Sequence, residues 1–217
     1  MSLTLLQTGL QSIYELEIDH NIENFILTNK SIANHFCQLN SNLNTREKLL
    51  VHQDEEGLNL SLYLEQELLD HYLDSDPLSN LGGHNIQEFC IVLEGISHFL
   101  YLAWNASHDR SVTLLEMELQ AEVDKFIMLM DCLERQSISS TTGQVSKLLF
   151  EKNIYHADLS GEELQRYVYA AKYARQYCRR LEDRYFEQGD RMGLLSELRK
   201  FYRLTKPDKL DRINQHH

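Results

Sequence analysis

The sequence has few residues that break helices. Its 217 residues include only two prolines and nine glycines, so long stretches lack the residues that usually end a helix or make a turn. This scarcity excludes a fold built from many short strands. The chain is also long enough to bury a core without disulfides or a structural metal. We therefore expect a mainly α fold, a single-domain helical bundle over residues 1–217.

The chain also lacks the signatures of a secreted or membrane protein. Its N-terminus has no basic segment ahead of an apolar run, unlike a secretory signal. No uninterrupted apolar run reaches the roughly 20 residues of a membrane helix. None of the cysteines forms a C-x-x-C pair, which favours reduced thiols in a reducing compartment. These cysteines are Cys37, Cys90, Cys132 and Cys178. We expect a soluble, cytoplasmic protein that contacts no membrane.

Positive charge is scarce as well. The net charge of −12 argues against nucleic acid as a partner, because a phosphate backbone attracts basic proteins. Residues 161–217 nevertheless hold 13 Lys and Arg against 9 Asp and Glu, a balance of +4 that leaves −16 for residues 1–160. Basic C-terminal helices packed across acidic helices would account for this split. The alternative is a dedicated site for an anionic ligand.

Apolar residues recur at helical spacing over most of the chain. We expect helices over residues 3–16, 22–39, 65–73, 85–105, 111–134, 144–152, 160–186 and 191–202, and a brief turn after Pro207. Asn85 with Glu88, and Thr113 with Glu116, have the spacing of capping pairs at the starts of two of these helices. We expect those two helices, residues 85–105 and 111–134, to form an antiparallel hairpin.

One segment alternates with a period of two instead. Leu58, Leu60, Leu62 and Leu64 follow a DEEG turn and are separated by polar or small residues, a pattern typical of a strand. Residues 49–53 precede the turn and would be the partner strand, so we expect a small β-hairpin near residues 49–64. Two strands alone are only marginally stable, so this hairpin must lie on the helices or pair with another chain.

The predicted helix over residues 85–105 is apolar on most of its surface, as a central helix is. At about 100° per residue, Glu94, His98, Tyr101 and Asn105 fall within one narrow polar stripe. A buried carboxylate is costly unless it is protonated, hydrogen-bonded, ion-paired or bound to a metal. Glu94, His98 and Tyr101 are therefore the candidate catalytic residues of this sequence.

A second acidic ridge lies on the next predicted helix, where Glu118, Glu122 and Lys125 follow helical spacing. If the two helices are antiparallel neighbours, Glu94 and His98 would converge with Glu118 and Glu122. Helical bundles build metal sites from carboxylate and imidazole ligands that project inward in this way. The candidate metal ligands are Glu94, His98, Glu118 and Glu122, and the candidate cofactor is a divalent metal ion. The alternative is a structural network in which Glu94 and His98 pair with each other or with Lys125.

This arrangement resembles the sites of ferritin-like di-iron proteins, which use Glu-x-x-His elements on facing helices. Here Glu94 and His98 are four residues apart, and no second Glu-x-x-His element exists, so the chemistry of that family does not carry over. The adjacent pair His108 and Asp109 is similar to the metal-binding pair of metal-dependent phosphohydrolases. That pair is expected on a buried helix, whereas here it lies in a predicted exposed turn.

Three tyrosines form a further stripe, at positions 169, 173 and 177 of the helix predicted over residues 160–186. Packing against another helix or a second copy of the chain accounts for such a stripe. The alternative is an aromatic and basic surface, completed by neighbouring arginines, that receives an acidic protein or a small-molecule ligand. The arginines in question are Arg166, Arg180, Arg184, Arg199 and Arg203.

The sequence contains no glycine-rich phosphate loop, dinucleotide-binding fingerprint, nucleophile elbow or zinc-type Cys/His spacing, so common nucleotide and acyl-transfer chemistries lack support. We expect a cytoplasmic helical binding or regulatory protein that self-associates as a homodimer. It would use helix faces and the hairpin edge as contact surfaces. The alternative is a small-molecule or metal-dependent enzyme whose pocket contains Glu94, His98, Tyr101, Glu118 and Glu122.

Overall fold

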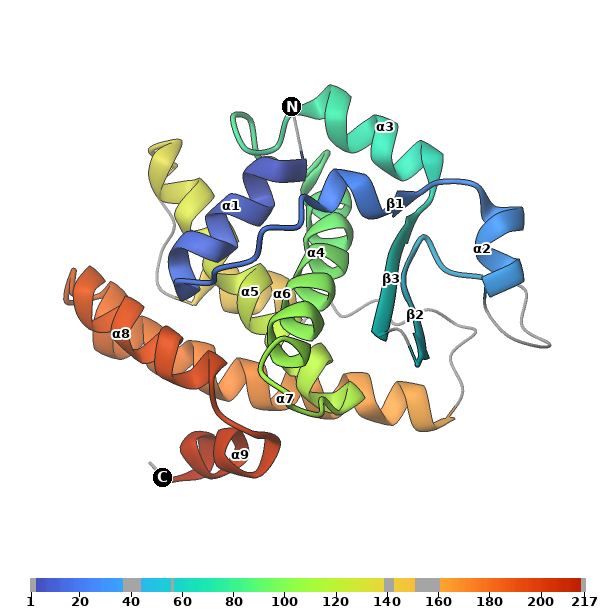
Figure 1. Ribbon diagram of the computed structural model, residues 1–217. Helices are drawn as coiled ribbons and strands as arrows, with labels where there is room; N and C mark the ends of the chain where they lie inside the picture. The colour runs from blue at the N-terminus through green and yellow to red at the C-terminus, as the bar shows by residue number, and fades with distance from the viewer. Residues whose placement is uncertain (1–2, 37–43, 56, 139–142, 151–160, 216–217) are drawn as a thin grey trace. The chain divides into compact units, whose positions relative to one another are not determined.

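The computed structural model describes residues 3–36, 44–55, 57–138, 143–150 and 161–215. The chain is 68% helical with one small sheet (Figure 1), which confirms the expected mainly α fold. Its contacts divide it into two compact units, Met1–Gly9 with Glu17–Ser111 and Leu10–Leu16 with Val112–His217. Helix α1 (Leu3–Tyr14) contributes to both units. The expectation of a single domain stays a prediction.

The first unit contains a three-stranded sheet of order β1-β3-β2. Strands β2 (Glu47–Asp54) and β3 (Gly57–Leu64) are antiparallel, with Val51 opposite Leu60. This pair confirms the hairpin predicted from the alternating leucines. The two-residue strand β1 (Ile26–Leu27) pairs with β3 in parallel and was not predicted.

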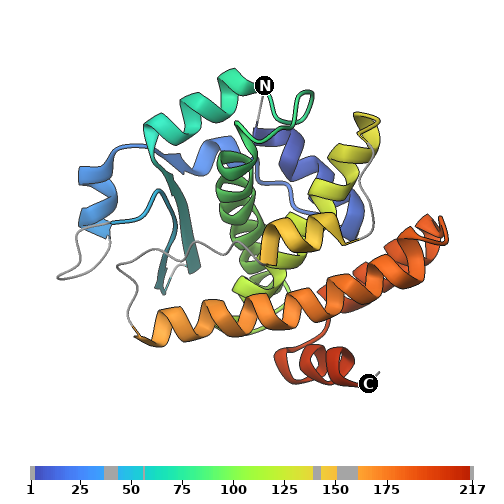
Figure 2. The same cartoon turned by 180° about the vertical axis from the view of Figure 1, so that it is seen from behind.

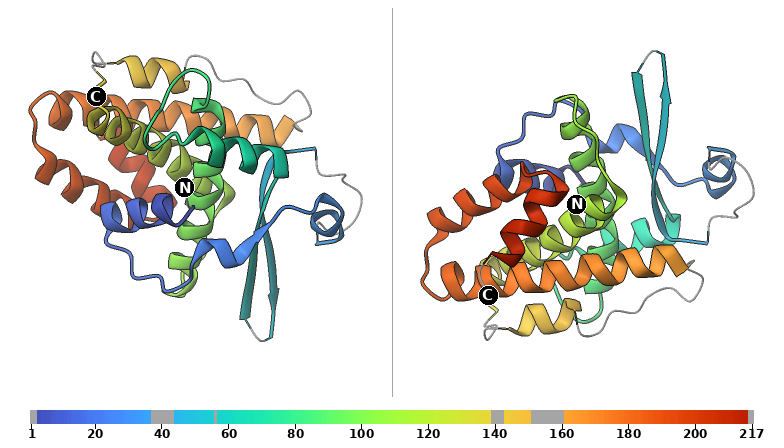
Figure 3. Two further views of the ribbon diagram at one scale, coloured as in Figure 1. Left: turned by 90° about the horizontal axis from the view of Figure 1, so that it is seen from above. Right: turned by 90° about the horizontal axis from the view of Figure 1, so that it is seen from below.

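The two faces of the sheet pack against different helices (Figure 3). One face lies on α4 (Ile86–Ala106), where a Cβ atom added to Gly95 would stand 2.7 Å from Leu62 Cδ1. The opposite face carries a small core of Leu50, Tyr63 and Ala33, the last from α2 (Lys30–Phe36). Because side chains alternate along a strand, the period-two pattern in the sequence supplies both faces.

The helix predicted over residues 22–39 is wrong, because three short elements replace it. These are a 3-10 helix, η1 (Ile22–Phe25), then β1, then α2. The Asn21 side chain accepts a hydrogen bond from Glu23 N at 3.0 Å, and the Asn29 side chain accepts from Ser31 N at 3.0 Å. Asparagine side chains that bond the following backbone end one element and begin another. Residues 37–39 of the predicted helix lie outside the described residues.

Two further helices complete the first unit, α3 (Gln66–Ser75) and α4, and they pack against each other. Asn85 is the N-cap residue of α4, as predicted, but its side chain makes no cap hydrogen bond. Its side chain accepts from Gly82 N and donates to Ser75 O and Asn80 O, so it ties the preceding loop together. By length and composition α4 is the one helix of the described residues that could cross a membrane, and 56% of its most apolar window is buried within the protein.

The second unit contains α5 (Leu114–Arg135), α6 (Gln144–Phe150), α7 (Gly161–Leu181), the π-helical segment η2 (Glu182–Phe186) and α8 (Arg191–Tyr202). These agree with the predicted helices, although residues 151–152 and 160 lie outside the described part of the chain. The capping box of Thr113 and Glu116 is confirmed, since each side chain bonds the backbone of the other residue.

The predicted turn after Pro207 is wrong, because residues Lys206–Asn214 form a helix, α9. Its start carries signals that sequence reasoning passed over. Thr205 is the N-cap residue, its hydroxyl lies 2.5 Å from Asp208 Oδ2, and Pro207 occupies the first turn, where proline is favoured. Figure 2 shows α9 beside α7, with which it is in contact.

Candidate functional site

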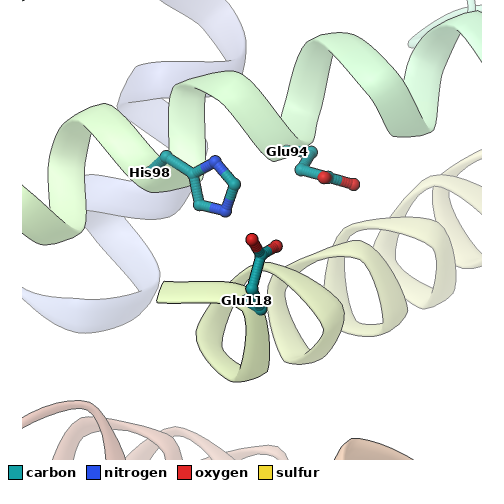
Figure 4. A group of neighbouring side chains, drawn as sticks. All are labelled: Glu94, His98 and Glu118. Carbon is teal, nitrogen blue, oxygen red and sulfur yellow. The ribbon is translucent and has the colours of Figure 1, made fainter. Parts of the chain in front are cut away.

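The polar stripe predicted on the central apolar helix is present on α4. Glu94 and His98 lie one turn apart on the same helix (Figure 4). Glu94 is half-buried, whereas His98 is only 5% exposed and Tyr101 only 1% exposed. Asn105 is buried too, and its Nδ2 donates to the carbonyl oxygen of Tyr101 at 2.8 Å. The stripe is thus a buried polar feature of the first unit.

Sequence reasoning missed Glu47, an acidic residue close to His98 within this unit. Glu47 begins β2, and its Oε1 lies 3.8 Å from His98 Nδ1, with both side chains nearly buried. The approach depends on Gly95, because a Cβ atom there would stand 2.9 Å from both Cγ and Oε1 of Glu47. A glycine inside a helix that is otherwise rich in large apolar residues was the available signal, since such a glycine often marks close packing.

The other predicted metal ligands, Glu118 and Glu122, lie on α5 in the second unit, and each faces a cation there. Glu122 Oε1 lies 2.8 Å from Lys125 Nζ, and Glu118 Oε1 lies 3.6 Å from Arg166 Nε on α7. Lys125 therefore pairs with a neighbour on its own helix. The four predicted ligands come from two units, so their convergence stays a prediction.

The second unit contains a buried polar network that the sequence did not indicate. Lys209 on α9 has no exposed surface, and its Nζ donates to Gln120 Oε1 at 2.7 Å. The Gln120 amide nitrogen donates to Asp124 Oδ1 at 2.8 Å and lies 3.1 Å from the Tyr14 hydroxyl. Tyr14 in turn donates to the same Asp124 oxygen at 2.5 Å. Three segments far apart in the sequence are thereby joined to one another.

Aromatic rings enclose this network. The Tyr14 ring stacks on Tyr202 at 4.3 Å between centroids, and Lys209 Nζ lies 4.8 Å from the centre of the Phe201 ring. A cation over an aromatic face is favourable, which offsets part of the cost of removing the amine from water. The network is buried and its members bond one another, so it fits a role in holding α9 rather than in chemistry on a substrate.

Burial shifts the protonation equilibria of this network. It lowers the pKa of Lys209 to about 7, although the negative charges of Asp124 and Glu116 act in the opposite direction. Burial also raises the pKa of Tyr14 well above its ordinary value, and the Asp124 charge adds to that shift. Each group is therefore pushed toward its neutral form, as desolvation requires.

The tyrosine stripe on α7 runs from the surface into the core. Tyr169 is 42% exposed, whereas Tyr177 is 1% exposed and stacks on Phe201 at 3.9 Å. Two of the nearby arginines bond backbone carbonyls within the same unit. Arg180 donates to the carbonyls of residues 212 and 213 at 2.8 Å each, and Arg199 donates to that of residue 13 at 3.0 Å. The buried end of the stripe serves packing.

The pair His108 and Asp109 lies in the turn after α4, as expected from the sequence. The His108 ring packs on Trp104 at 4.3 Å between centroids, and its Nδ1 lies 2.8 Å from the Trp104 carbonyl oxygen. Asp109 has a φ of +54°, the left-handed backbone of a turn residue. This is the geometry of a helix end, unlike the buried pair of a phosphohydrolase.

The hairpin of the first unit presents an open edge. Among the described residues β2 is hydrogen-bonded to β3 alone, so its other side has no neighbouring strand. Residues 51–54 are exposed, and Val51 is 52% exposed. Leu58 and Leu60 line a cavity of about 440 Å³ and are only half-buried. The turn half of the hairpin is therefore incompletely covered within its own unit.

Comparison with known proteins finds no match for this chain. No family model matches the chain, and no curated protein and no solved structure is found to be similar to it. Its function must therefore be argued from its own residues.

Proposed function

We propose that this protein is a cytoplasmic helical binding protein that acts through self-association. The observation that carries the proposal is the open edge of β2, which has exposed residues and pairs with no second strand among the residues that the structure describes. Such an edge pairs readily with another strand, and proteins usually cover or block it. Here the residues of β2 next to the turn, 51–54, are exposed, and they include Val51. Their exposure favours an interaction over a purely structural role.

The polar groups inside the units support the same interpretation. Lys209, Gln120, Asp124 and Tyr14 bond one another away from solvent, and His98 lies near Glu47 in a nearly buried position. A catalytic acid or base must reach its substrate, and these groups are directed at the chain itself. The edge of β2, by contrast, is exposed and available for recognition.

The test is the molecular mass in solution as a function of concentration. Light scattering after size exclusion, and sedimentation velocity, should show a reversible shift from one chain to two as the protein is concentrated. A single-chain mass over a hundredfold concentration range would contradict self-association.

A second candidate function is metal binding, with or without catalysis, and one observation favours it. Glu94 and His98 lie one turn apart on one helix, a spacing that lets two side chains bind the same ion. The sequence hypothesis adds Glu118 and Glu122 as ligands. Elemental analysis of protein purified without a His tag or added metal tests this function, because stoichiometric iron, manganese or zinc would support it.

Two variants separate metal binding from a structural network. If Glu94→Gln and His98→Ala each remove bound metal, the stripe is a metal site. If both leave the metal content unchanged and lower the melting temperature, the stripe stabilises the fold and the second candidate is wrong.

A further inference from the structure

We propose that the occupant of the open β2 edge is a second copy of the chain, paired antiparallel about a two-fold axis at Val51. This inference rests on the proposed self-association and specifies its surface and register. It extends the three-stranded sheet of the first unit into a six-stranded sheet across two copies. An isologous contact of this kind closes on itself and does not propagate into a fibre.

The exposed charges of β2 decide the register. With Val51 at the axis, Lys48 of one copy lies opposite Asp54 of the other, and the two-fold axis creates this pair twice. Lys48 and Asp54 are both exposed, and both lie on the strand face that carries Leu50 and His52. Opposite charges in directly facing positions stabilise a strand pair, and like charges destabilise it.

The neighbouring symmetric register is less favourable. In a symmetric antiparallel pair, residues that face each other must lie on the same side of the sheet. The axis must therefore run between the strands at the level of a residue that faces its own copy. An axis at Leu50 would also pair seven β2 residues, but it would place Lys48 opposite His52. It would place Asp54 opposite Arg46, which precedes the strand and already pairs with Glu65 at 2.9 Å. The Val51 axis pairs residues 48–54, all within the strand.

The central pair supplies apolar contact. Val51 is 52% exposed in the single chain, and the axis places it against its own copy. β-branched residues in facing positions pack well across strands. Lys48 also helps to select the register. A lysine on an edge strand opposes pairing in registers that place no opposite charge across from it. The charge pattern therefore favours the Val51 register over the Leu50 register.

Charge reversal tests this register directly. Lys48→Glu places a carboxylate opposite each Asp54, and Asp54→Lys places an ammonium group opposite each Lys48. Each variant alone should therefore dimerise at least roughly tenfold more weakly than the wild type. An equimolar mixture of the two variants should recover dimers. Unlike a dimer of either variant alone, the mixed dimer places opposite charges at both facing positions. The double variant Lys48→Glu with Asp54→Lys should dimerise like the wild type.

The pairing in the mixed dimer follows from the same register. One of its two facing positions joins the introduced glutamate of the first variant to the introduced lysine of the second, and the other joins the native Asp54 of the first to the native Lys48 of the second. Both pairs are of opposite charge, so both stabilise the strand contact. The mixture therefore isolates the facing positions from any effect of either substitution by itself.

The controls separate the register from the fold. Lys172→Glu makes the same charge change at an exposed position of α7 and should dimerise like the wild type. Asp54 also accepts hydrogen bonds from Gly57 N and Asn59 Nδ2 in the hairpin, so the melting temperature of each variant is measured alongside. Because rescue by mixing uses the same two chains that fail alone, misfolding cannot produce it.

Each result has one meaning. Dimers of the wild type, loss in the single variants and recovery in the mixture support the register. Wild-type dimers that persist unchanged in Lys48→Glu, or a mixture that stays monomeric, would overturn the register while the proposed self-association stands. A wild-type chain that is monomeric at every concentration would overturn both.

Discussion

Tyr14 and Asp124 are 110 residues apart in the sequence, yet the Tyr14 hydroxyl donates to Asp124 Oδ1 at 2.5 Å in the core of the second unit. Tyr14 ends α1, and Asp124 lies in the middle of α5. The same carboxylate oxygen accepts from Gln120, which in turn accepts from Lys209 on α9. A single carboxylate therefore organises contacts among three helices.

Removing the hydroxyl should weaken this unit. Tyr14→Phe leaves the ring in place but removes one of the donors to the buried Asp124, and a hydrogen bond to a charged group contributes about 1.5–3 kcal/mol. We expect the free energy of unfolding to fall by about 2 kcal/mol in urea denaturation. Tyr173→Phe, a half-buried tyrosine of α7, is the control and should be nearly neutral. Equal stability of Tyr14→Phe and the wild type would show that the bond contributes nothing.

The buried amine should make stability depend on pH. Burial lowers the folded-state pKa of Lys209 from 10.5 to about 7, so above pH 7 the unfolded chain holds a proton that the folded chain has released. Unfolding then takes up a proton, and stability rises with pH. We expect the free energy of unfolding to increase by roughly 1 kcal/mol per pH unit from about pH 7 to pH 8.5.

The rise in stability with pH should end above about pH 8.5 for a physical reason. Burial raises the pKa of Tyr14 above 10.0 and that of Cys132 from 9.0 to about 11, so both groups lose a proton more readily in the unfolded chain and lower stability at higher pH. Lys209→Met should abolish the rise below about pH 8.5. Lys200→Met, at an exposed position of α8, should retain it, and a retained rise in Lys209→Met would assign it to another group.

The end of α9 depends on a side chain from α7. Arg180 donates to the last carbonyls of α9, those of residues 212 and 213, where helix carbonyls lack intrahelical partners. Arg180→Gln should therefore speed amide hydrogen exchange over Lys206–Asn214, by roughly tenfold if about 1.4 kcal/mol of local stability is lost. The adjacent exposed residue provides the control: Arg179→Gln should leave this exchange unchanged.

Gly95 should be intolerant of a side chain. A Cβ atom there would approach both Leu62 and Glu47 to within 3 Å, and overpacking of this kind costs about 1–3 kcal/mol. We expect Gly95→Val to lower the melting temperature by several degrees. Gly83→Val is the matched control, since a Cβ atom at Gly83 would meet nothing within 4 Å. A variant at Gly95 as stable as the control would mean that the sheet moves freely on α4.

Much of the secondary structure could be predicted from local patterns. The bounds of α8 were predicted as they are observed, and the capping box at Thr113 was recognised from spacing alone. Both depend on residues within a few positions of one another. The helix prediction over residues 22–39 failed because Asn21 and Asn29 each begin a separate short helix. It failed also because β1 gains its hydrogen bonds from β3, more than thirty residues further along the chain.

Only part of the candidate site could be predicted from local sequence patterns. The stripe of Glu94, His98 and Tyr101 follows from helical periodicity, and α4 carries it as expected. Glu47 could not be assigned to it, because its approach to His98 depends on how β2 packs on Gly95. Lys209 gave no signal either, since a lysine in a short polar segment is expected at the surface.

The sequence by itself determined the helical class, the hairpin and the polar stripe of α4, because periodicity and capping act over short stretches of chain. Only the tertiary structure decided which polar groups meet: Tyr14 with Asp124, Lys209 with Gln120, and His98 near Glu47. The physical reason is burial. A polar group removed from water needs a hydrogen-bond partner, and the packing of helices and strands decides which residue supplies it. The spacing of residues along the chain does not predict that partner.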